Sequence, residues 1–416
     1  MVHIKKHFTL LLLCLLLPCI SDATHKAITI VPVADLVGQP MQQWYANQSI
    51  HQSYATLPLC GAGTAAQAGR VCPRIHQLLF NEMVEVIAEH GEEVHIRVPQ
   101  VFYCTQASNV KHNTFWTAKK NLLSVHTLQQ HQVDMRLFPQ PVVAKTTYRA
   151  IPQHIAILVE PYTDPKTKLT FSVGTRFVYD PDTITHKKIG LYIFHPDTYT
   201  MVLTYVAREK CVLPSTSHQE QKDNFVATLK KWAHPDKHAI PYVWGGCSFT
   251  TTHQTQNFLK KTCTLPHNNT GTYYAIPHNV QQTKTGFDCA GLIARAAQLN
   301  GLPYFCKNTM TALKTLQPLQ PNDRIQPGDI IYIPGHVIVI SDIEKNLIIE
   351  ARGYDHGYGK TQEIPLCEEF KDMYSLADLQ NAYHAKKTIH RLNKNGDVVQ
   401  KITNLVILKL DSIWSV

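Results

Sequence analysis

The sequence lacks the features that mark several large classes of protein. It shows no internal repeat, and after residue 20 it has no apolar run long enough to cross a bilayer as a helix. Its 416 residues are 44% hydrophobic and 17% charged, with 24 Pro and 19 Gly. This composition excludes collagen-like, coiled-coil and disordered chains and indicates a globular protein of two to four domains.

Two kinds of partner site are also missing from the sequence. There is no Cys-x-x-Cys pair, so neither a zinc ribbon nor a thioredoxin motif is supported. The formal net charge of +9 favours anionic partners such as cell-wall polymers, nucleic acid or membrane surfaces. However, the basic residues form no block and no nucleic-acid-binding signature is present. A generally basic surface is the simpler interpretation, and no nucleic-acid partner is predicted.

The first 23 residues have the pattern of a secretory signal peptide. Lys5 and Lys6 precede an apolar run of 13 residues at 8–20, and small residues follow up to Ala23. The sequence therefore predicts export to the periplasm or the exterior, without stable membrane insertion after cleavage. An uncleaved anchor or a buried strand is the alternative. Lipid attachment at Cys19 is disfavoured because Leu-Leu-Pro precedes this residue.

Nine of the eleven cysteines follow the predicted signal peptide. An odd number in an exported protein leaves at least one thiol unpaired, and disulfides among the others are compatible with that compartment. The connectivity cannot be deduced from the sequence. These nine are Cys60, Cys72, Cys104, Cys211, Cys247, Cys263, Cys289, Cys306 and Cys367.

The chain after the signal peptide divides by pattern into three parts. Residues 24–135 and 136–217 are β-rich, with strands expected at 92–98, 155–159, 169–177 and 190–194, and segment 78–88 is interpreted as a loop feeding a strand. Two small all-β units in succession suggest barrels. Residues 218–416 combine helices expected at 223–233, with Asp223 as N-cap, and at 287–300 with strands from residue 329 onward. The predicted fold class is α+β.

Cys289 lies at the predicted start of a helix, within Gly-Phe-Asp-Cys-Ala-Gly-Leu. A helix N-terminus presents free N–H groups and partial positive charge, which stabilise a thiolate, and a thiolate is the nucleophile of a cysteine peptidase. A lone cysteine is more often a buried structural residue or half of a disulfide. Cys289 becomes a candidate nucleophile only in combination with the residues that follow.

His336 follows a Pro-Gly turn at the mouth of a predicted strand, where its ring can face a cleft and act as a general base. The strands expected at 337–341 and 347–351 form a hairpin centred near residue 343 or 344, which places Glu350 roughly opposite His336. A carboxylate there orients the imidazole as the third member of a triad does. The alternative is a solvated glutamate at a strand end. His356, in a predicted loop, is a weaker rival.

A fourth motif is Pro-Tyr-Val-Trp-Gly-Gly at 241–246. Tyr242 and Trp244 can pack into a cleft wall, because the two following glycines allow close approach of the backbone. The Tyr242 hydroxyl can also donate to a developing oxyanion. Taken alone, this segment is only an aromatic turn.

These four motifs, in this order, resemble those of the NlpC/p60 cysteine peptidases, and the resemblance covers residues 220–360. It implies a papain-like catalytic domain that hydrolyses the stem peptides of peptidoglycan. Cys289 matches the nucleophile, His336 the base and Glu350 the third polar residue. Tyr242 matches the oxyanion-site aromatic residue, and Asp288 matches an acidic neighbour that binds the free amine of a stem peptide in some members.

The N-terminal part is similar to bacterial SH3-like domains that precede the catalytic domain in some members of this family. Such members are similar to γ-D-glutamyl-L-diamino acid endopeptidases, which cut peptides with a free N-terminal L-Ala. This resemblance implies that the first SH3-like domain closes the cleft and that Tyr103 lines the pocket for that end. Peptidoglycan stem peptides or muropeptides are the expected partners, and no metal or organic cofactor is implied.

Three departures from the family pattern limit the resemblance. Ala290 replaces the usual Ser, an insertion at 247–288 is much longer than the usual connection, and the third residue is Glu. Two alternatives therefore stay open: a non-catalytic wall-binding protein, and a papain-like amidase or acyltransferase acting on another substrate. The sequence does not determine the oligomeric state, the role of the insertion or the physiological role.

Overall fold

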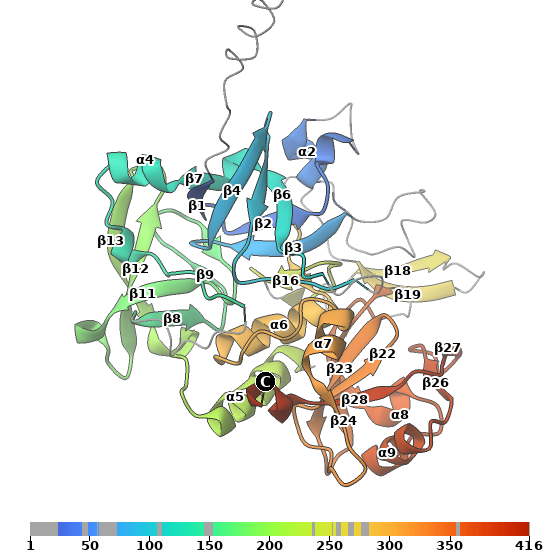
Figure 1. Ribbon diagram of the computed structural model, residues 1–416. Coiled ribbons are helices and arrows are strands. Elements are labelled where there is room, and N and C mark those ends of the chain that lie inside the picture. The colour runs from blue at the N-terminus through green and yellow to red at the C-terminus, as the bar shows by residue number, and fades with distance from the viewer. Residues whose placement is uncertain are drawn as a thin grey trace, which may run out of the picture.

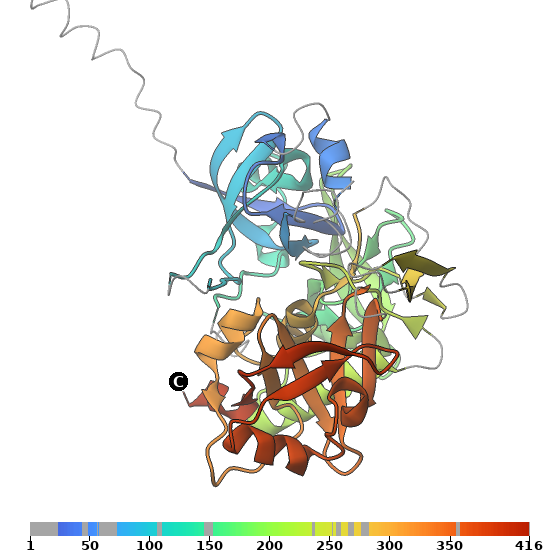
Figure 2. The same ribbon diagram turned by 90° about the vertical axis from the view of Figure 1, so that its right-hand side faces the viewer.

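The computed structural model describes residues 24–43, 49–55, 57, 73–105, 110–144, 153–234, 238–251, 253–254, 259–264, 270–275, 283–354 and 358–415. These residues form a mixed α+β structure with several antiparallel sheets (Figure 1). Both views place the N-terminal sheet on one side of the part of the chain that contains the longer helices (Figure 2). Within the described residues, no helix is long and apolar enough to cross a membrane.

The N-terminal part forms a seven-stranded antiparallel sheet in the order β3-β2-β6-β5-β4-β1-β7. Segment 78–88, expected to begin as a loop, instead contains the end of β3 and most of β4. Asn81, with a φ of 67°, lies in the tight turn between them. The strands are β1 (His25–Thr29), β2 (Val33–Val37), β3 (Arg74–Leu79), β4 (Met83–His90), β5 (Glu93–Arg97), β6 (Thr114–Ala118) and β7 (Leu122–Ser124). Short helices α2 (Ile50–Ala55) and α4 (Val125–Gln130) accompany them.

The second β-rich part forms a five-stranded antiparallel sheet in the order β13-β12-β11-β8-β14. The strand expected at 169–177 is broken at 172–175, because the chain turns at Gly174, where φ is +84°. One apolar core joins this sheet to the first, with Phe80 packed against Phe171 and Phe177. The barrel form of the two units stays a prediction. The strands are β8 (Ile155–Leu158), β9 (Tyr162–Thr163), β10 (Thr170–Phe171), β11 (Arg176–Asp180), β12 (Lys188–His195), β13 (Thr200–Ala207) and β14 (Cys211–Val212).

The third part has a six-stranded antiparallel sheet in the order β21-β28-β22-β23-β24-β25. Successive residues of a strand point to opposite faces. On β23, Val337 and Val339 accordingly join the core shared with α5 and α6, whereas Ile338 and Ile340 join the core shared with α9. The strands are β21 (Gln317–Pro318), β22 (Ile330–Ile333), β23 (His336–Asp342), β24 (Leu347–Arg352), β25 (Lys360–Pro365) and β28 (Val406–Lys409), with the hairpin β26 (Ile389–Leu392) and β27 (Val398–Ile402) beside them.

The helices of this part are α5 (His218–Ala233), α6 (Cys289–Leu299), α7 (Thr309–Thr315), α8 (Leu366–Glu369) and α9 (Leu376–His384). The start predicted for α5 was wrong by five residues. Ser217, rather than Asp223, is the N-cap, and its side chain accepts from the backbone N–H of Glu220. This Ser-x-x-Glu spacing is a recognised helix start. The helix predicted at 287–300 is confirmed as α6, two residues later at its start and one earlier at its end.

The long insertion contains strands that its weak periodicity did not predict. Strand β16 (Cys247–Ser248) pairs with β20 (Gly286–Phe287), and β17 (His253–Gln254) pairs with β15 (His238–Ala239), which precedes the insertion. Strands β18 (Leu259–Thr264) and β19 (Thr270–Ala275) form a separate hairpin. Residues 252, 255–258, 265–269 and 276–282 of the insertion lie outside the described residues.

Six cysteines in the described part of the chain are free thiols. Five of them are buried or half-buried, and Cys367 is exposed. Cys60 and Cys72 lie outside the described residues, as does the side chain of Cys263. The six free thiols are Cys104, Cys211, Cys247, Cys289, Cys306 and Cys367.

Candidate active site

Cys289 is the first residue of α6, as the sequence predicts. Asp288 caps the helix, because its Oδ1 accepts from the backbone N–H of Gly291. Its other oxygen accepts from the backbone N–H of Gly245 at 3.0 Å. One carboxylate therefore holds together the start of α6 and the loop that follows Trp244.

Two glycines let the backbone segments around Cys289 approach closely. A Cβ on Gly291 would lie 1.9 Å from the carbonyl oxygen of Gly246. A Cβ on Gly245 would lie 2.6 Å from the carbonyl oxygen of Arg74, and Gly245 also has a φ of +69°. Both positions therefore need glycine, the second because of its conformation as well as its packing.

His336 begins β23 directly after the turn at Gly335, and its Nε2 lies 2.7 Å from Oε2 of Glu350 on β24. An ionised carboxylate only accepts, so Nε2–H is the donor and Nδ1 is the free nitrogen of the neutral ring. Strand β23 pairs Val339 with Ile349, which sets Glu350 diagonal to His336 rather than directly opposite. The two side chains share a face of the sheet, and their length bridges the diagonal.

A buried network surrounds Glu350, whose exposed fraction is 1%. Gln362 donates to Oε1 at 3.0 Å, and Arg391 donates to Oε2 at 3.1 Å. Burial alone raises the pKa of Glu350, but Arg352, the hydrogen bond from His336 and Arg391 together hold it well below its usual range. Glu350 is thus a carboxylate, not a carboxylic acid, at neutral pH.

Glu369 forms the far side of this network. It binds the guanidinium groups of both Arg352 and Arg391, and all three side chains are buried. Burial raises the pKa of Glu369 to about 7, and the nearby Glu350 acts in the same direction. The sequence indicated none of these three residues, because they come from β24, α8 and β26 and meet only in the folded chain.

The electrostatic setting of Cys289 and His336 differs from the one expected. Burial raises the pKa of the Cys289 thiol to about 12, and the charge of Asp288 acts in the same direction. Backbone N–H groups of Val337 and Ala290 oppose this shift without reversing it. Burial also lowers the pKa of His336 to about 4. Both shifts favour the neutral thiol and the neutral imidazole, whereas a helix N-terminus by itself favours the thiolate.

A cleft of about 470 Å³ opens beside Cys289 and His336. Six of the seven residues singled out from the sequence line it, and Glu350 lies behind His336. The structure thus brings all seven together, whereas their individual chemical roles stay predictions. The six lining residues are Tyr103, Tyr242, Trp244, Asp288, Cys289 and His336.

The N-terminal sheet supplies one wall of this cleft. Arg74 and Ile75 on β3 line it together with Tyr103. Arg74 is tied to Asp35 by two hydrogen bonds of 2.8 and 3.1 Å and donates to the carbonyl of Trp244 at 3.1 Å. The cleft therefore lies between two parts of the chain that are far apart in sequence.

Four cationic residues of the cleft were not predicted from the sequence, because no local pattern marks them. Each stands outside the four motifs, on β3, on β24, on β26 or in the segment between α6 and α7. They are Arg74, Lys307, Arg352 and Arg391. The rival His356 lies outside the described residues.

His336, Glu350 and Glu369 are grouped closely enough to hold a metal ion, each offering one ligand atom within 4.8 Å of the others. However, the two carboxylates already bind guanidinium groups of Arg352 and Arg391. A cation would meet two positive charges at that point. The donor set therefore fits an ion-pair network better than a metal site.

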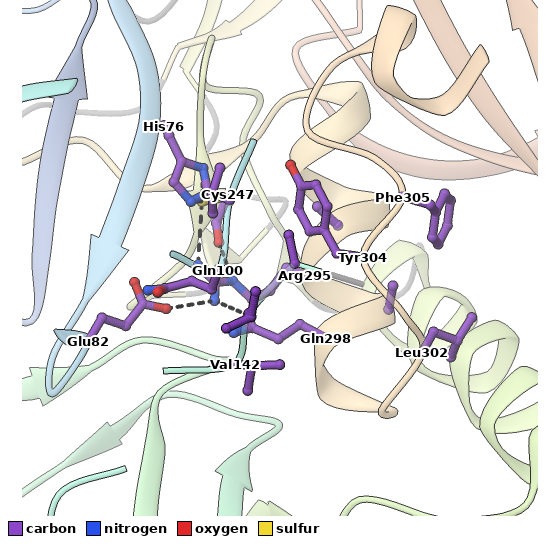
Figure 3. A pocket seen from close by; sticks show the side chains of 15 residues that line it. His76, Glu82, Gln100, Val142, Cys247, Arg295, Gln298, Leu302, Tyr304 and Phe305 are labelled. Carbon is purple, nitrogen blue, oxygen red and sulfur yellow. Dashed lines mark hydrogen bonds and ion pairs between the residues drawn. The ribbon is translucent and has the colours of Figure 1, made fainter. Parts of the chain in front are cut away.

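A second and smaller cavity lies between the N-terminal sheet and α6 (Figure 3). The side chain of Arg295, on α6, donates to the carbonyl of Cys247 at 2.7 Å and lies 3.6 Å from Glu82. The thiol of Cys247 is 3.3 Å from Nδ1 of His76, whose pKa burial holds well below its usual value. These contacts attach the helix that carries Cys289 to the N-terminal sheet.

Comparisons with known proteins give a structural likeness only. No protein-family model and no curated protein matches the chain. An NlpC/P60 family protein from Bacillus cereus matches with a TM-score of 0.49 and 13% identity, over 82% of this chain and 94% of that one. NlpC2 from Trichomonas vaginalis matches with a TM-score of 0.29 and 12% identity, over 82% and 93%. The peptidoglycan hydrolase RipB from Mycobacterium tuberculosis matches with a TM-score of 0.22 and 21% identity, over 36% and 62%.

Proposed function

We propose that this protein is a cysteine endopeptidase that hydrolyses peptidoglycan stem peptides. The observation that carries the proposal is the 2.7 Å hydrogen bond between His336 and Glu350 in the wall of the cleft that also contains Cys289. A cysteine at a helix N-terminus, a histidine and an orienting carboxylate are together the groups that thiol-dependent acyl transfer requires. The four sequence motifs support the choice of substrate class.

Catalysis starts from the neutral pair. His336 accepts the thiol proton of Cys289 through Nδ1 as the sulfur attacks the scissile carbonyl, and a tetrahedral oxyanion forms. The Tyr242 hydroxyl donates to this oxyanion. The imidazolium, held by Glu350, then protonates the leaving amine as the C–N bond breaks. Water hydrolyses the resulting thioester and regenerates the thiol.

The bond that fits this cleft best is the one between γ-D-Glu and the diamino acid, in peptides with a free N-terminal L-Ala. Asp288 supplies a negative charge beside Cys289 for the free amine, and Trp244 and Tyr103 supply apolar walls. The wall formed by the N-terminal sheet limits the length of peptide that can extend past the nucleophile. We also propose export, on the basis of the signal-peptide pattern of residues 1–23.

The test is mass spectrometry of L-Ala-γ-D-Glu-diaminopimelate after incubation with the mature protein or with Cys289→Ala. The proposal requires release of L-Ala-D-Glu by the parent protein only. If neither protein cleaves this peptide or larger wall fragments, the endopeptidase proposal fails and a wall-binding role takes its place. If Cys289 reacts with an acyl donor but a different product forms, an amidase or acyltransferase is indicated.

A further inference from the structure

Not every charge that lines the cleft has an ion-pair partner in the described part of the chain. Four cationic side chains contribute to its walls: Arg74, Lys307, Arg352 and Arg391. Arg74 is paired with Asp35 at 2.8 Å, and the other two arginines bind Glu369. Lys307 differs from all three, because in the described part of the chain no carboxylate lies within 4.0 Å of its ammonium and no side-chain hydrogen bond holds it.

This unpaired lysine is also buried, with an exposed fraction of only 3%. A buried charge without a partner is costly, because the surrounding protein replaces its hydration poorly. Burial raises the pKa of Asp288, and the nearby charge of Lys307 opposes this shift without reversing it. The oxygens of Asp288 accept from the backbone N–H groups of Gly245 and Gly291, and neither oxygen forms an ion pair with Lys307. The position of Lys307 is therefore suited to an anion that enters the cleft.

The surroundings hold Lys307 firmly in this place. The next residue, Asn308, caps α7 and donates to the carbonyl of Cys104 at 2.7 Å. The backbone N–H of Cys104 donates in turn to Thr311 at 3.1 Å. Lys307 therefore lies where the catalytic domain meets the segment that carries Tyr103. Alanine at 290, beside the nucleophile, offers no side-chain donor that would compete for the same anion.

We infer that Lys307 binds a carboxylate of the peptide substrate beside Cys289. This inference rests on the proposed function and names the substrate group that the cleft selects. The C-terminal carboxylate of a tripeptide is an amide in longer stem peptides, so two carboxylates close to the scissile amide remain in stem peptides of any length, and the inference concerns these two. The γ-linkage leaves the α-carboxylate of D-Glu free, and diaminopimelate carries a further carboxylate on its side chain. Either forms a charge-assisted hydrogen bond with an ammonium.

The substrate side of the test uses three peptides with the unmodified protein. The first is L-Ala-γ-D-Glu-diaminopimelate. The second has the α-carboxylate of D-Glu converted to an amide, and the third has L-Lys in place of diaminopimelate. We expect kcat/KM to fall by about tenfold or more for the second or the third peptide, which identifies the carboxylate that is recognised.

The protein side uses Lys307→Met and Lys307→Arg, with Lys345→Met as a matched control on an exposed turn. Lys307→Met should lower kcat/KM for the first peptide by about tenfold or more. This variant should then cleave the first peptide no faster than the modified peptide that lacks the recognised carboxylate. Lys307→Arg keeps the charge and should keep most of the discrimination. The control should behave as the unmodified protein does.

The outcomes separate this inference from the proposed function. If the unmodified protein cleaves none of the peptides, the proposed function fails and the inference fails with it. If it cleaves all three equally well, only the inference is overturned. The inference is also overturned if Lys307→Met has the same melting curve as the parent protein and still prefers the first peptide by the same factor as the parent does. If Lys307→Met does not fold, the three-peptide comparison and Lys307→Arg still decide.

Discussion

Arg391 donates a hydrogen bond of 3.1 Å to Glu350, the carboxylate that holds the ring of His336. The same guanidinium binds Glu369, so a buried ion-pair network stands behind the proposed triad. A carboxylate with so many donors cannot rotate freely. We infer that this network keeps the imidazole in the tautomer whose Nδ1 can receive the thiol proton.

Replacement of Glu350 by Gln tests this positioning role. The change keeps the size of the side chain but removes the charge and allows the amide to donate to His336, which favours the wrong tautomer. We expect kcat to fall by about 100-fold or more, with a smaller change in KM. Steady-state kinetics on the tripeptide measures both. A variant with unchanged kcat would show that Glu350 has only a structural role. Glu363→Gln, on the neighbouring strand, is the control.

The pH dependence of kcat/KM should show the lowered pKa of His336. Below this pKa the ring is protonated and cannot accept the thiol proton, so activity is lost as the pH falls through it. Because burial lowers this pKa to about 4, we expect the acid limb of kcat/KM near pH 4. A free histidine would place that limb near pH 6.5. A limb at the higher value would mean that the free enzyme contains a protonated His336 at mildly acidic pH.

Removal of the Arg391 guanidinium should destabilise the fold. Arg391→Met leaves Glu350 and Glu369 as buried neighbours with fewer partners, and breaking a buried ion pair in this way costs about 3–5 kcal/mol. The free energy of unfolding in urea measures the loss. Arg136→Met, which breaks an exposed pair with Asp134, should have no measurable effect. Equal effects of the two changes would contradict the importance of the network.

Gly291→Ala should disturb the start of α6. The added Cβ would lie 1.9 Å from the carbonyl oxygen of Gly246, so the backbone must move. We expect a loss of about 1–3 kcal/mol in the free energy of unfolding and a lower kcat, because Cys289 shifts with the helix. Gly38→Ala meets only the end of the flexible Ile75 side chain and should cost less. The two variants can be compared by urea denaturation, and an equally mild effect of both would argue against the close packing at Gly291.

The N-terminal sheet and the second sheet were anticipated as β-rich because their alternation is a local property. The same holds for α6, whose apolar face, capping Asp288 and terminal Asn300 lie within a short stretch. Where the local sequence pattern was weaker, the predicted bounds of helices and strands were less accurate. The start of α5 was placed five residues too late because Asp223 is also a good capping residue type. The strands within the insertion carried no periodicity that could reveal them.

The sequence by itself determined that Cys289 begins a helix, that His336 begins a strand and that Glu350 lies on the next strand. These are properties of neighbouring residues, capping side chains and strand alternation. Tertiary structure decided the rest. The Arg391–Glu369 network, the place of Arg74 in the cleft and the unpaired Lys307 depend on contacts between distant segments. The electrostatic state of Cys289 also depends on burial, which outweighs the helix N-terminus and which no local pattern contains.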